Sequence, residues 1–523
     1  MTKTNITLLA AAMLSLASCK KALEPAFQDN ANGIDELVTD RVQENPAAFS
    51  QISLLDIGET GAAEISTYCE KTKKLFVVNN SSGNNRIDVI DFSDPHTPVF
   101  LTSINIATYG GLVNSVAVHD GLLAAAIESV PKTDNGKLVV LKTTDYAVVN
   151  ISTVGALPDM VTYSPDGKFI LTANEGEPNT DYSIDPLGTV SIISVKDNYA
   201  VTTLNFSSFA PMEAALKARG LRKFGPNASF AQDMEPEYIT VSTDSRTAWV
   251  TLQENNAIAK IDIRNKTITE IFPLGFKNYN LAQSAIDPSD RPLGTLSFNP
   301  WPVYGVYMPD AIAVLENNKG TSSTPYLFTA NEGDAREYSS FAEEVRIGSS
   351  SVTLDPVIFP NATVLKQNEN LGRLNITNTL GKNPATNRYE KLYSFGARSF
   401  SVWNGNTGNQ VFDSKNELEQ KAVTAGFYDD DRSDSKGVEP EGIAIGEVNK
   451  RMLAFVGMER ADAVAIYDVT DPVNPVFLQM LATGDAPEGV LFIHSKDSPV
   501  KRSLLVISSE NDGVIRVYMP AEQ

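Results

Sequence analysis

The feature of this sequence that most constrains its fold is a strand-like segment that opens with proline and an acidic residue and recurs along the chain. Five copies begin at Pro158, Pro236, Pro309, Pro440 and Pro487. Segments at Glu64 and Asn114 take the same place in two earlier units. A repeat with a period of a few tens of residues indicates a fold assembled from similar units.

Each opening segment is followed by a polar turn and then by further apolar runs. The second runs are residues 75–78, 122–127, 169–173, 247–252, 326–330, 452–457 and 504–508. The third runs are residues 87–92, 137–142, 189–195, 258–263, 400–403, 463–469 and 514–519. Alternating, β-branched runs of this length favour strands. Seven such units without a helical period between them predict an all-β fold, a seven-bladed β-propeller.

The last unit lacks a fourth strand, although fourth strands are visible in other units at residues 99–107 and 476–483. An unassigned run of the same kind, residues 52–58, precedes the first unit. An unpaired strand edge promotes aggregation. We therefore expect this N-terminal strand to complete the seventh blade and close the ring, in a single domain of residues 50–523.

The first residues have the pattern of an export signal. Lys3 precedes an uncharged run at residues 6–17, which is too short to span a bilayer, and small residues precede Cys19. This resembles the lipobox of bacterial lipoproteins. The resemblance implies a signal peptide at residues 1–18, a lipid on Cys19, a tether at residues 19–49, and an exported protein anchored to the bacterial cell envelope, at the outer membrane. The alternative is an ordinary signal peptide that contains a cysteine.

Charge and cysteine content restrict the partners. Cys69 is the only cysteine besides Cys19, so the exported chain forms no internal disulfide. A net charge of −21 argues against nucleic acid and anionic membrane surfaces as partners and favours cations. Acidity also keeps exported proteins soluble, which is enough to explain most of these residues. We expect a monomer.

Two sets of acidic residues are expected at one edge of the sheets. One set ends the second strands: Glu128, Glu175, Glu254, Glu332, Glu459 and Glu510, with Asn80 in the first unit. The other follows the prolines: Asp159, Glu237, Asp310, Glu441 and Glu488. In an antiparallel hairpin the start of one strand and the end of the next share an edge, so the two sets should converge. Such charges repel one another unless they are neutralised, and carboxylate oxygens are what Ca²⁺ or another divalent cation selects.

The alternative for each of these acids is a structural role, in which the carboxylate accepts backbone N–H groups from a neighbouring blade.

The face of the propeller that carries the acids also collects the long insertions, and long loops beside a rigid frame often carry binding sites. They are residues 176–188, 207–234, 265–308, 333–398 and 429–434.

Within the insertions, Arg336, Tyr338, Arg398 and Arg432 are groups that could meet an anionic substrate. Arginine pairs equally well with a neighbouring carboxylate, and we favour that role here. No catalytic residue is assigned; Arg336 and Arg432 are the only candidates. The three histidines, at 96, 119 and 494, provide too little material for a Ser-His-Asp site, a zinc site or a haem site.

Several segments together resemble the choice-of-anchor I family of exported propeller proteins. They are residues 172–177 (TANEGE), 329–338 (TANEGDAREY) and 431–443 (DRSDSKGVEPEGI). The resemblance covers residues 50–520 and implies the propeller but no settled activity. The turns at residues 91–100 and 468–477 resemble those of LVIVD-type propeller repeats.

A looser similarity, through the acid-rich face and residues 84–88 (NNRID), is to calcium-dependent propeller phytases. The sequence departs from them because it lacks an evident cluster of lysine and arginine beside the acids.

Two functions follow from these patterns. The first is an envelope-anchored protein that binds a protein, a glycan or a small anionic ligand on an acidic, Ca²⁺-binding face. The second is a metal-dependent phosphoesterase, resembling alkaline phosphatases or phytases, in which metal-bound water attacks a phosphoryl group. The absence of a nucleophile paired with histidine favours the first.

Overall fold

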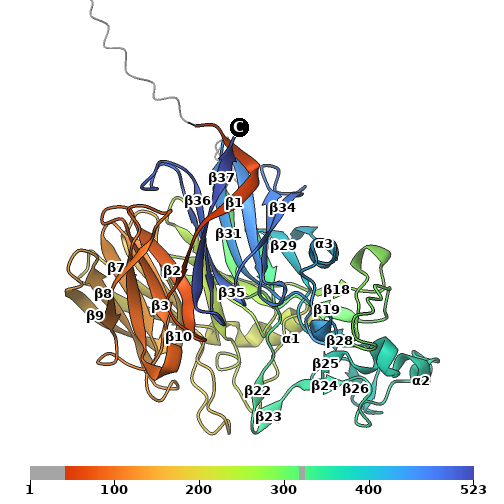
Figure 1. Ribbon diagram of the computed structural model, residues 1–523. Coiled ribbons are helices and arrows are strands. Elements are labelled where there is room, and N and C mark those ends of the chain that lie inside the picture. The colour runs from red at the N-terminus through yellow and green to blue at the C-terminus, as the bar shows by residue number, and fades with distance from the viewer. Residues whose placement is uncertain (1–41, 317–323) are drawn as a thin grey trace, which may run out of the picture. The chain divides into compact units, whose positions relative to one another are not determined.

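The repeating element of the structure is a four-stranded antiparallel sheet (Figure 1). The computed structural model describes residues 42–316 and 324–523. The predicted signal peptide and Cys19 lie outside the described residues. No helix among those residues is long and apolar enough to cross a membrane.

The described residues form seven four-stranded sheets. From first to fourth strand they are β2 (Ala62–Cys69), β3 (Lys74–Asn79), β4 (Arg86–Asp91) and β5 (Val99–Asn105); β6 (Val113–His119), β7 (Leu122–Ile127), β8 (Asn135–Lys142) and β9 (Val148–Ala156); β10 (Pro158–Tyr163), β11 (Phe169–Asn174), β12 (Thr189–Ser194) and β13 (Ala200–Asn205); β14 (Pro236–Val241), β15 (Thr247–Leu252), β16 (Ala257–Asp262) and β17 (Thr267–Pro273); β20 (Ile312–Glu316), β21 (Pro325–Asn331), β29 (Ser399–Asn404) and β30 (Gln410–Asp413); β31 (Pro440–Val448), β32 (Arg451–Met458), β33 (Ala463–Asp468) and β34 (Val476–Ala482); and β35 (Pro487–Ile493), β36 (Leu504–Ser509), β37 (Val514–Glu522) and β1 (Glu44–Asp56).

The predicted second and third runs all form strands, because their apolar residues are buried on both faces of each sheet. Strand β7 is buried from Leu123 to Ile127, and β12 along its whole length. Outer strands alternate instead, as in β13, where every residue is exposed or half-buried. Inner strands therefore pack between two neighbouring sheets, and outer strands face water.

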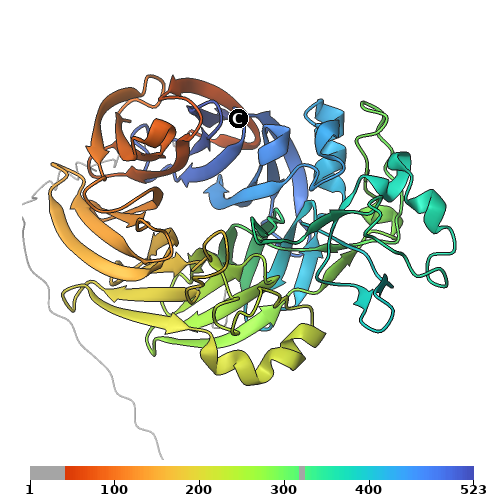
Figure 2. The same ribbon diagram turned by 90° about the horizontal axis from the view of Figure 1, so that it is seen from below.

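The first strands of successive sheets contact one another (Figure 2). Contacts run from β2 to β6, β10, β14, β20, β31 and β35, and β35 contacts β2. Apolar side chains fill the spaces between adjacent sheets: Phe76 and Val78 of β3 share one core with Leu123 and Ala125 of β7. The starts of the first strands therefore lie near one another.

Strand β1 pairs antiparallel with β37, with Ser53 opposite Val517 and Asp56 opposite Val514. It begins at Glu44, so residues 44–49, expected to belong to the tether, lie in a strand instead. The strand extends this far because the Glu44 carboxylate accepts hydrogen bonds from Arg502 Nε (2.9 Å) and from the Ser503 N–H (2.8 Å).

The insertions contain secondary structure of their own. They include helices α1 (Glu213–Ala218) and α2 (Ala362–Leu365), whereas helix α3 (Glu417–Ala425) lies between β30 and β31, outside the expected insertions. The insertions also include the short strands β18 (Phe276–Asn278), β19 (Tyr304–Val306), β22 (Glu337–Tyr338), β23 (Phe341–Ala342), β24 (Glu344–Arg346), β25 (Asn375–Thr377), β26 (Lys382–Asn383), β27 (Arg388–Tyr389) and β28 (Tyr393–Ser394). Two of these insertions share an apolar core of their own, which contains Tyr279, Leu371 and Leu392.

Deleting residues 42–56 should destabilise the whole protein, because it removes the partner of β37 and the buried Glu44 contacts. We expect one cooperative unfolding transition at a clearly lower temperature, measured by circular dichroism against a chain that begins at residue 42. An unchanged melting temperature would contradict this expectation.

Candidate functional site

Four of the five acidic residues that follow the prolines lie where the first strands depart from regular pairing, and Asp310, the fifth, lies just before its strand. The register of the first hairpin shifts between Pro158 and Met160 and between Pro487 and Gly489. Similar shifts span Glu64, Asn114, Glu237 and Glu441. A β-bulge bends a strand and redirects a side chain. The irregularity thus recurs at the residues that carry the charges.

A left-handed residue stands before the proline in several units. Leu157, Glu439 and Ala486 have φ values of 48°, 49° and 56°. The carbonyl of each accepts a 2.9 Å hydrogen bond from the N–H of the glutamate that ends the second strand, namely Glu175, Glu459 and Glu510 respectively. This bond holds the end of the second strand against the start of the first, which brings the two sets of acids together.

A cavity of about 310 Å³, here called the central cavity, lies at the start of the first strands. Six carboxylates line it: Glu64, Asp159, Glu237, Asp310, Glu441 and Glu488. Asn80, Asn114, Ser66, Ser115 and Tyr238 also line it, and none of the described residues in its wall is Lys or Arg. Its charge is therefore not neutralised by the wall itself.

Burial raises the pKa of every carboxyl group in this wall. The pKa of Glu64 rises to about 8, from burial and then from repulsion by Glu510. Burial and neighbouring carboxylates hold the pKa of Asp310, Glu441 and Glu488 well above the usual range. Without a cation, the cavity retains protons near neutral pH.

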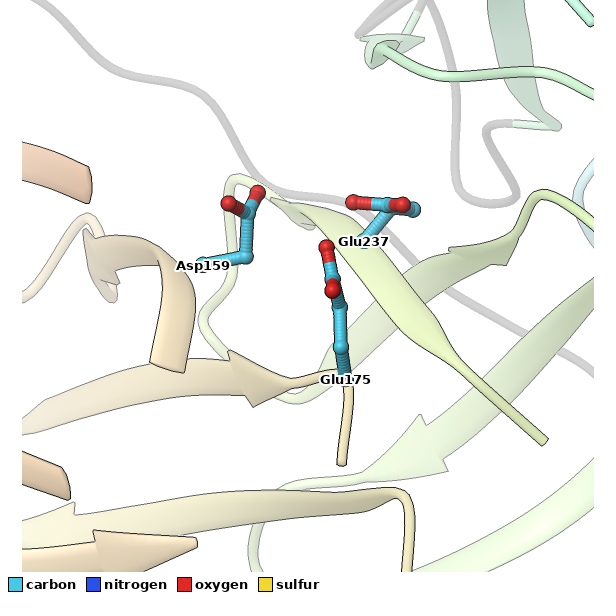
Figure 3. Close-up of side chains that lie close together, drawn as sticks. All are labelled: Asp159, Glu175 and Glu237. Atoms are coloured by element: carbon cyan, nitrogen blue, oxygen red, sulfur yellow. The ribbon is translucent and has the colours of Figure 1, made fainter. Parts of the chain in front are cut away.

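Three carboxylates form a compact triad (Figure 3). Oxygens of Asp159, Glu175 and Glu237 lie within 4.8 Å of one another. Burial is the main cause that raises the pKa of Asp159 to about 7 and the pKa of Glu175 and Glu237 well above the usual range. Repulsion by Glu177 adds to the raised pKa of Asp159 and Glu175, and a hydrogen bond with Glu237 opposes it. None of the three forms an ion pair with a described residue. The triad has the ligand chemistry of a divalent-cation site.

A second compact cluster, Glu332, Glu439 and Glu459, is already neutralised. Lys436 Nζ lies 2.7 Å from Glu332 Oε1 and 3.1 Å from Glu439 Oε2, and Arg460 pairs with Glu459 at 2.8 Å. Burial alone would raise the pKa of Glu332, but Lys436 reverses the shift and lowers it. In this cluster the ammonium group of Lys436 supplies the positive charge that a metal ion would otherwise supply.

The remaining metal candidates are dispersed. Glu128 accepts the N–H of Leu112 at 3.3 Å, a contact within its own sheet and not the expected one to a neighbouring sheet. Glu510 lies near Glu488 and Glu64 and adds to the raised pKa of both groups. Glu254 lines a different cavity, described below.

The arginines singled out in the sequence are held by carboxylates. Arg336 is buried and pairs with Asp233 at 2.8 Å and Glu235 at 2.6 Å. Arg432 Nε donates to Glu439 at 2.9 Å, and Arg398 pairs with Glu419 at 3.2 Å. Tyr338 donates to Glu177 at 2.9 Å. None of these groups is free to bind a phosphoryl oxygen.

The structure also adds residues that sequence patterns missed. Glu439 stands directly before Pro440, and Glu177 ends the TANEGE segment, so both lay in recognised motifs. Of the basic groups, Arg346 and Arg373 lie in the insertion at residues 333–398 and Lys436 lies in the segment at residues 431–443, and nothing in the sequence linked them. His119 and His494 line a cavity of about 560 Å³ at the other end of their first strands, away from the acids.

The family described as Choice-of-anchor I domain matches residues 64–472. The chain belongs to the choice-of-anchor I family. Membership points to a surface-anchored extracellular protein.

This choice-of-anchor I protein is similar to two named proteins. It is 29% identical over 367 residues to a mesenchyme-specific cell surface glycoprotein of Strongylocentrotus purpuratus, covering 60% of this chain and 46% of that protein. It is 26% identical over 182 residues to Gigasin-3a of Magallana gigas, covering 28% of this chain and 64% of that protein. The chain spans less than two thirds of either relative.

Similar solved structures include the WD40 domain of Toxoplasma gondii coronin, with 8% identity and a TM-score of 0.48, covering 92% of this chain and 89% of that chain. Another is the β-propeller domain of Cps50 (Swd1) from Myceliophteria thermophila, with 7% identity and a TM-score of 0.44, covering 90% of this chain and 100% of that chain.

The raised pKa values predict that the metal-free protein loses stability as pH rises. The ordinary pKa values are 3.8 for Asp159 and 4.5 for Glu64, and the folded values are about 7 and about 8; between them the folded state holds protons that the unfolded state releases. Each such proton lowers the free energy of unfolding by about 1.4 kcal/mol per pH unit. Melting temperatures in chelator should therefore fall from pH 5 to pH 8.

The Glu237→Gln variant should flatten this dependence, because the amide of glutamine carries no titrating proton. Glu213→Gln, on the exposed helix α1, should follow the unaltered protein. A melting temperature in chelator that rises between pH 5 and pH 8 would show that these carboxylates are neutralised in some other way.

Proposed function

We propose that this choice-of-anchor I protein is a binding protein of the bacterial cell envelope whose acidic face holds Ca²⁺ and, through it, a ligand or partner. One observation carries the proposal: six carboxylates line the central cavity, with no lysine or arginine among the described residues of its wall. Like charges buried at this density require protons or a cation.

The frame of the site is, in this proposal, one seven-bladed propeller in which β1 closes the ring. The pairing of β1 with β37 and the contact between β35 and β2 support this arrangement. A ring of this kind would hold the acids rigidly around a common centre, with the insertions above them as the surface that meets a partner.

Ca²⁺ fits this site better than a transition metal. The triad offers only carboxylate oxygens, which are hard ligands, and no described histidine or cysteine lines the central cavity. Ca²⁺ takes six to eight oxygen ligands in flexible geometry and leaves positions for water or a ligand. A bound cation would attract a carboxylate or glycan hydroxyl group of a partner.

Binding is favoured over phosphoester hydrolysis. A phosphoesterase needs cationic side chains free to hold phosphoryl oxygens beside the metal. Here Arg336 and Arg432 are paired with carboxylates, and no specific observation favours the enzyme.

Calcium should bind the purified protein and raise its melting temperature. At a Ca²⁺ concentration of 100 times Kd, the free energy of unfolding should increase by about 2.7 kcal/mol. Calorimetric titration after chelation measures the affinity, and the double variant Asp159→Asn, Glu237→Gln should lose most of it. Glu213→Gln is the matched control. If neither heat nor a thermal shift accompanies Ca²⁺ addition, the cation site does not exist.

We also propose that a lipid on Cys19 attaches the protein to the outer membrane. The Cys19→Ser variant, expressed in a bacterial host, should move from the membrane fraction to the soluble exported fraction and lose incorporated fatty acid. Cys69 is buried within β2, so Cys69→Ser should stay with the membrane. Unchanged membrane association of Cys19→Ser would reject the lipid anchor.

A further inference from the structure

A second cavity, here called the side cavity, lies among the insertions and has a volume of about 660 Å³. Nine carboxylates and six basic groups line it. The wall therefore holds more acidic than basic groups. A wall with both signs of charge could bind an anion or a cation. Which of the two it binds depends on which charged side chains have no ion-pair partner.

Each of the six basic groups is already engaged. Arg336 pairs with Asp233 and Glu235, Arg346 with Asp434, Arg373 with Asp290 and Asp434, Arg432 with Glu439, Arg460 with Glu459, and Lys436 with Glu332 and Glu439. An anionic ligand would have to break one of these pairs, several of which are buried, and leave a carboxylate uncompensated. The cavity is therefore poorly suited to phosphate or sulfate.

Four carboxylates of the wall form no ion pair with a described residue: Glu254, Glu337, Glu344 and Asp431. Glu254 is the most constrained, since it is only 7% exposed and its Oε2 has no hydrogen-bond partner among the described residues. A buried acceptor without a partner is costly, and a donor supplied by a ligand would remove that cost.

We propose that the side cavity binds a small organic polyamine, a ligand with two or more alkylammonium groups. None of the four unpaired carboxylates belongs to a compact group of three acids that could enclose a metal ion, as the triad does. Their charges are spread around the wall, which suits ammonium groups separated by a carbon chain. Lys436 already forms such an ammonium–carboxylate interaction at this cavity, because its ammonium group pairs with Glu332 and Glu439.

The polyamine site rests on the proposed binding function but uses different residues from the Ca²⁺ site. Spermidine should bind the purified protein in calorimetric titrations, with and without Ca²⁺, and sodium chloride should weaken the binding, because the attraction is between charges. Removing the carboxyl group in Glu254→Gln should lower spermidine affinity about tenfold. Glu344→Gln should also weaken binding, whereas Glu213→Gln should leave it unchanged.

Two further probes define the ligand. Sodium phosphate should not bind, and a lysine peptide with blocked ends tests whether the ammonium groups can come from a peptide instead of a free amine. The double variant Asp159→Asn, Glu237→Gln should lose Ca²⁺ but keep spermidine, which separates this site from the proposed function. Three results would overturn the proposal. They are the absence of spermidine binding, spermidine affinities of the folded Glu254→Gln and Glu344→Gln variants equal to that of the unaltered protein, and tighter binding of phosphate than of spermidine.

Discussion

The burial of like-charged carboxylates at the start of the first strands is the constraint on which the rest of the site depends. Recurrent bulges carry the acids there, and in three units a 2.9 Å bond such as that from Glu175 N–H to the Leu157 carbonyl brings a second acid beside the proline. Packed sheets prevent these strand ends from separating to relieve the repulsion. The charge must therefore be compensated locally by a proton, a cation or a basic side chain.

The two compact clusters show two of these solutions side by side. In the cluster of Glu332, Glu439 and Glu459, Lys436 supplies the positive charge from an insertion, and the pKa of Glu332 falls. In the triad, no described basic group arrives, and the pKa of Asp159 rises to about 7. The difference comes from the insertions and not from the repeat, since both clusters occupy equivalent strand ends.

The repeat made the strands predictable because burial on both faces demands apolar runs, and the acids after Pro158 and Pro487 marked one edge of the sheets. The extent of β1 was not predictable, because Glu44 at its start is held by Arg502 and Ser503, more than 400 residues away. The partners of Arg336 were equally hidden, because Asp233 and Glu235 lie about 100 residues earlier in an insertion without a repeat.

By itself the sequence determined the strand order, the placement of two sets of acids at one edge, and the pattern of an export signal, because these depend on local periodicity. Only the tertiary structure decided which acids are neutralised. Ion pairing depends on distances of a few ångströms between segments far apart in the chain, and the insertions that bring Lys436, Arg346 and Arg373 to the acids follow no repeating pattern.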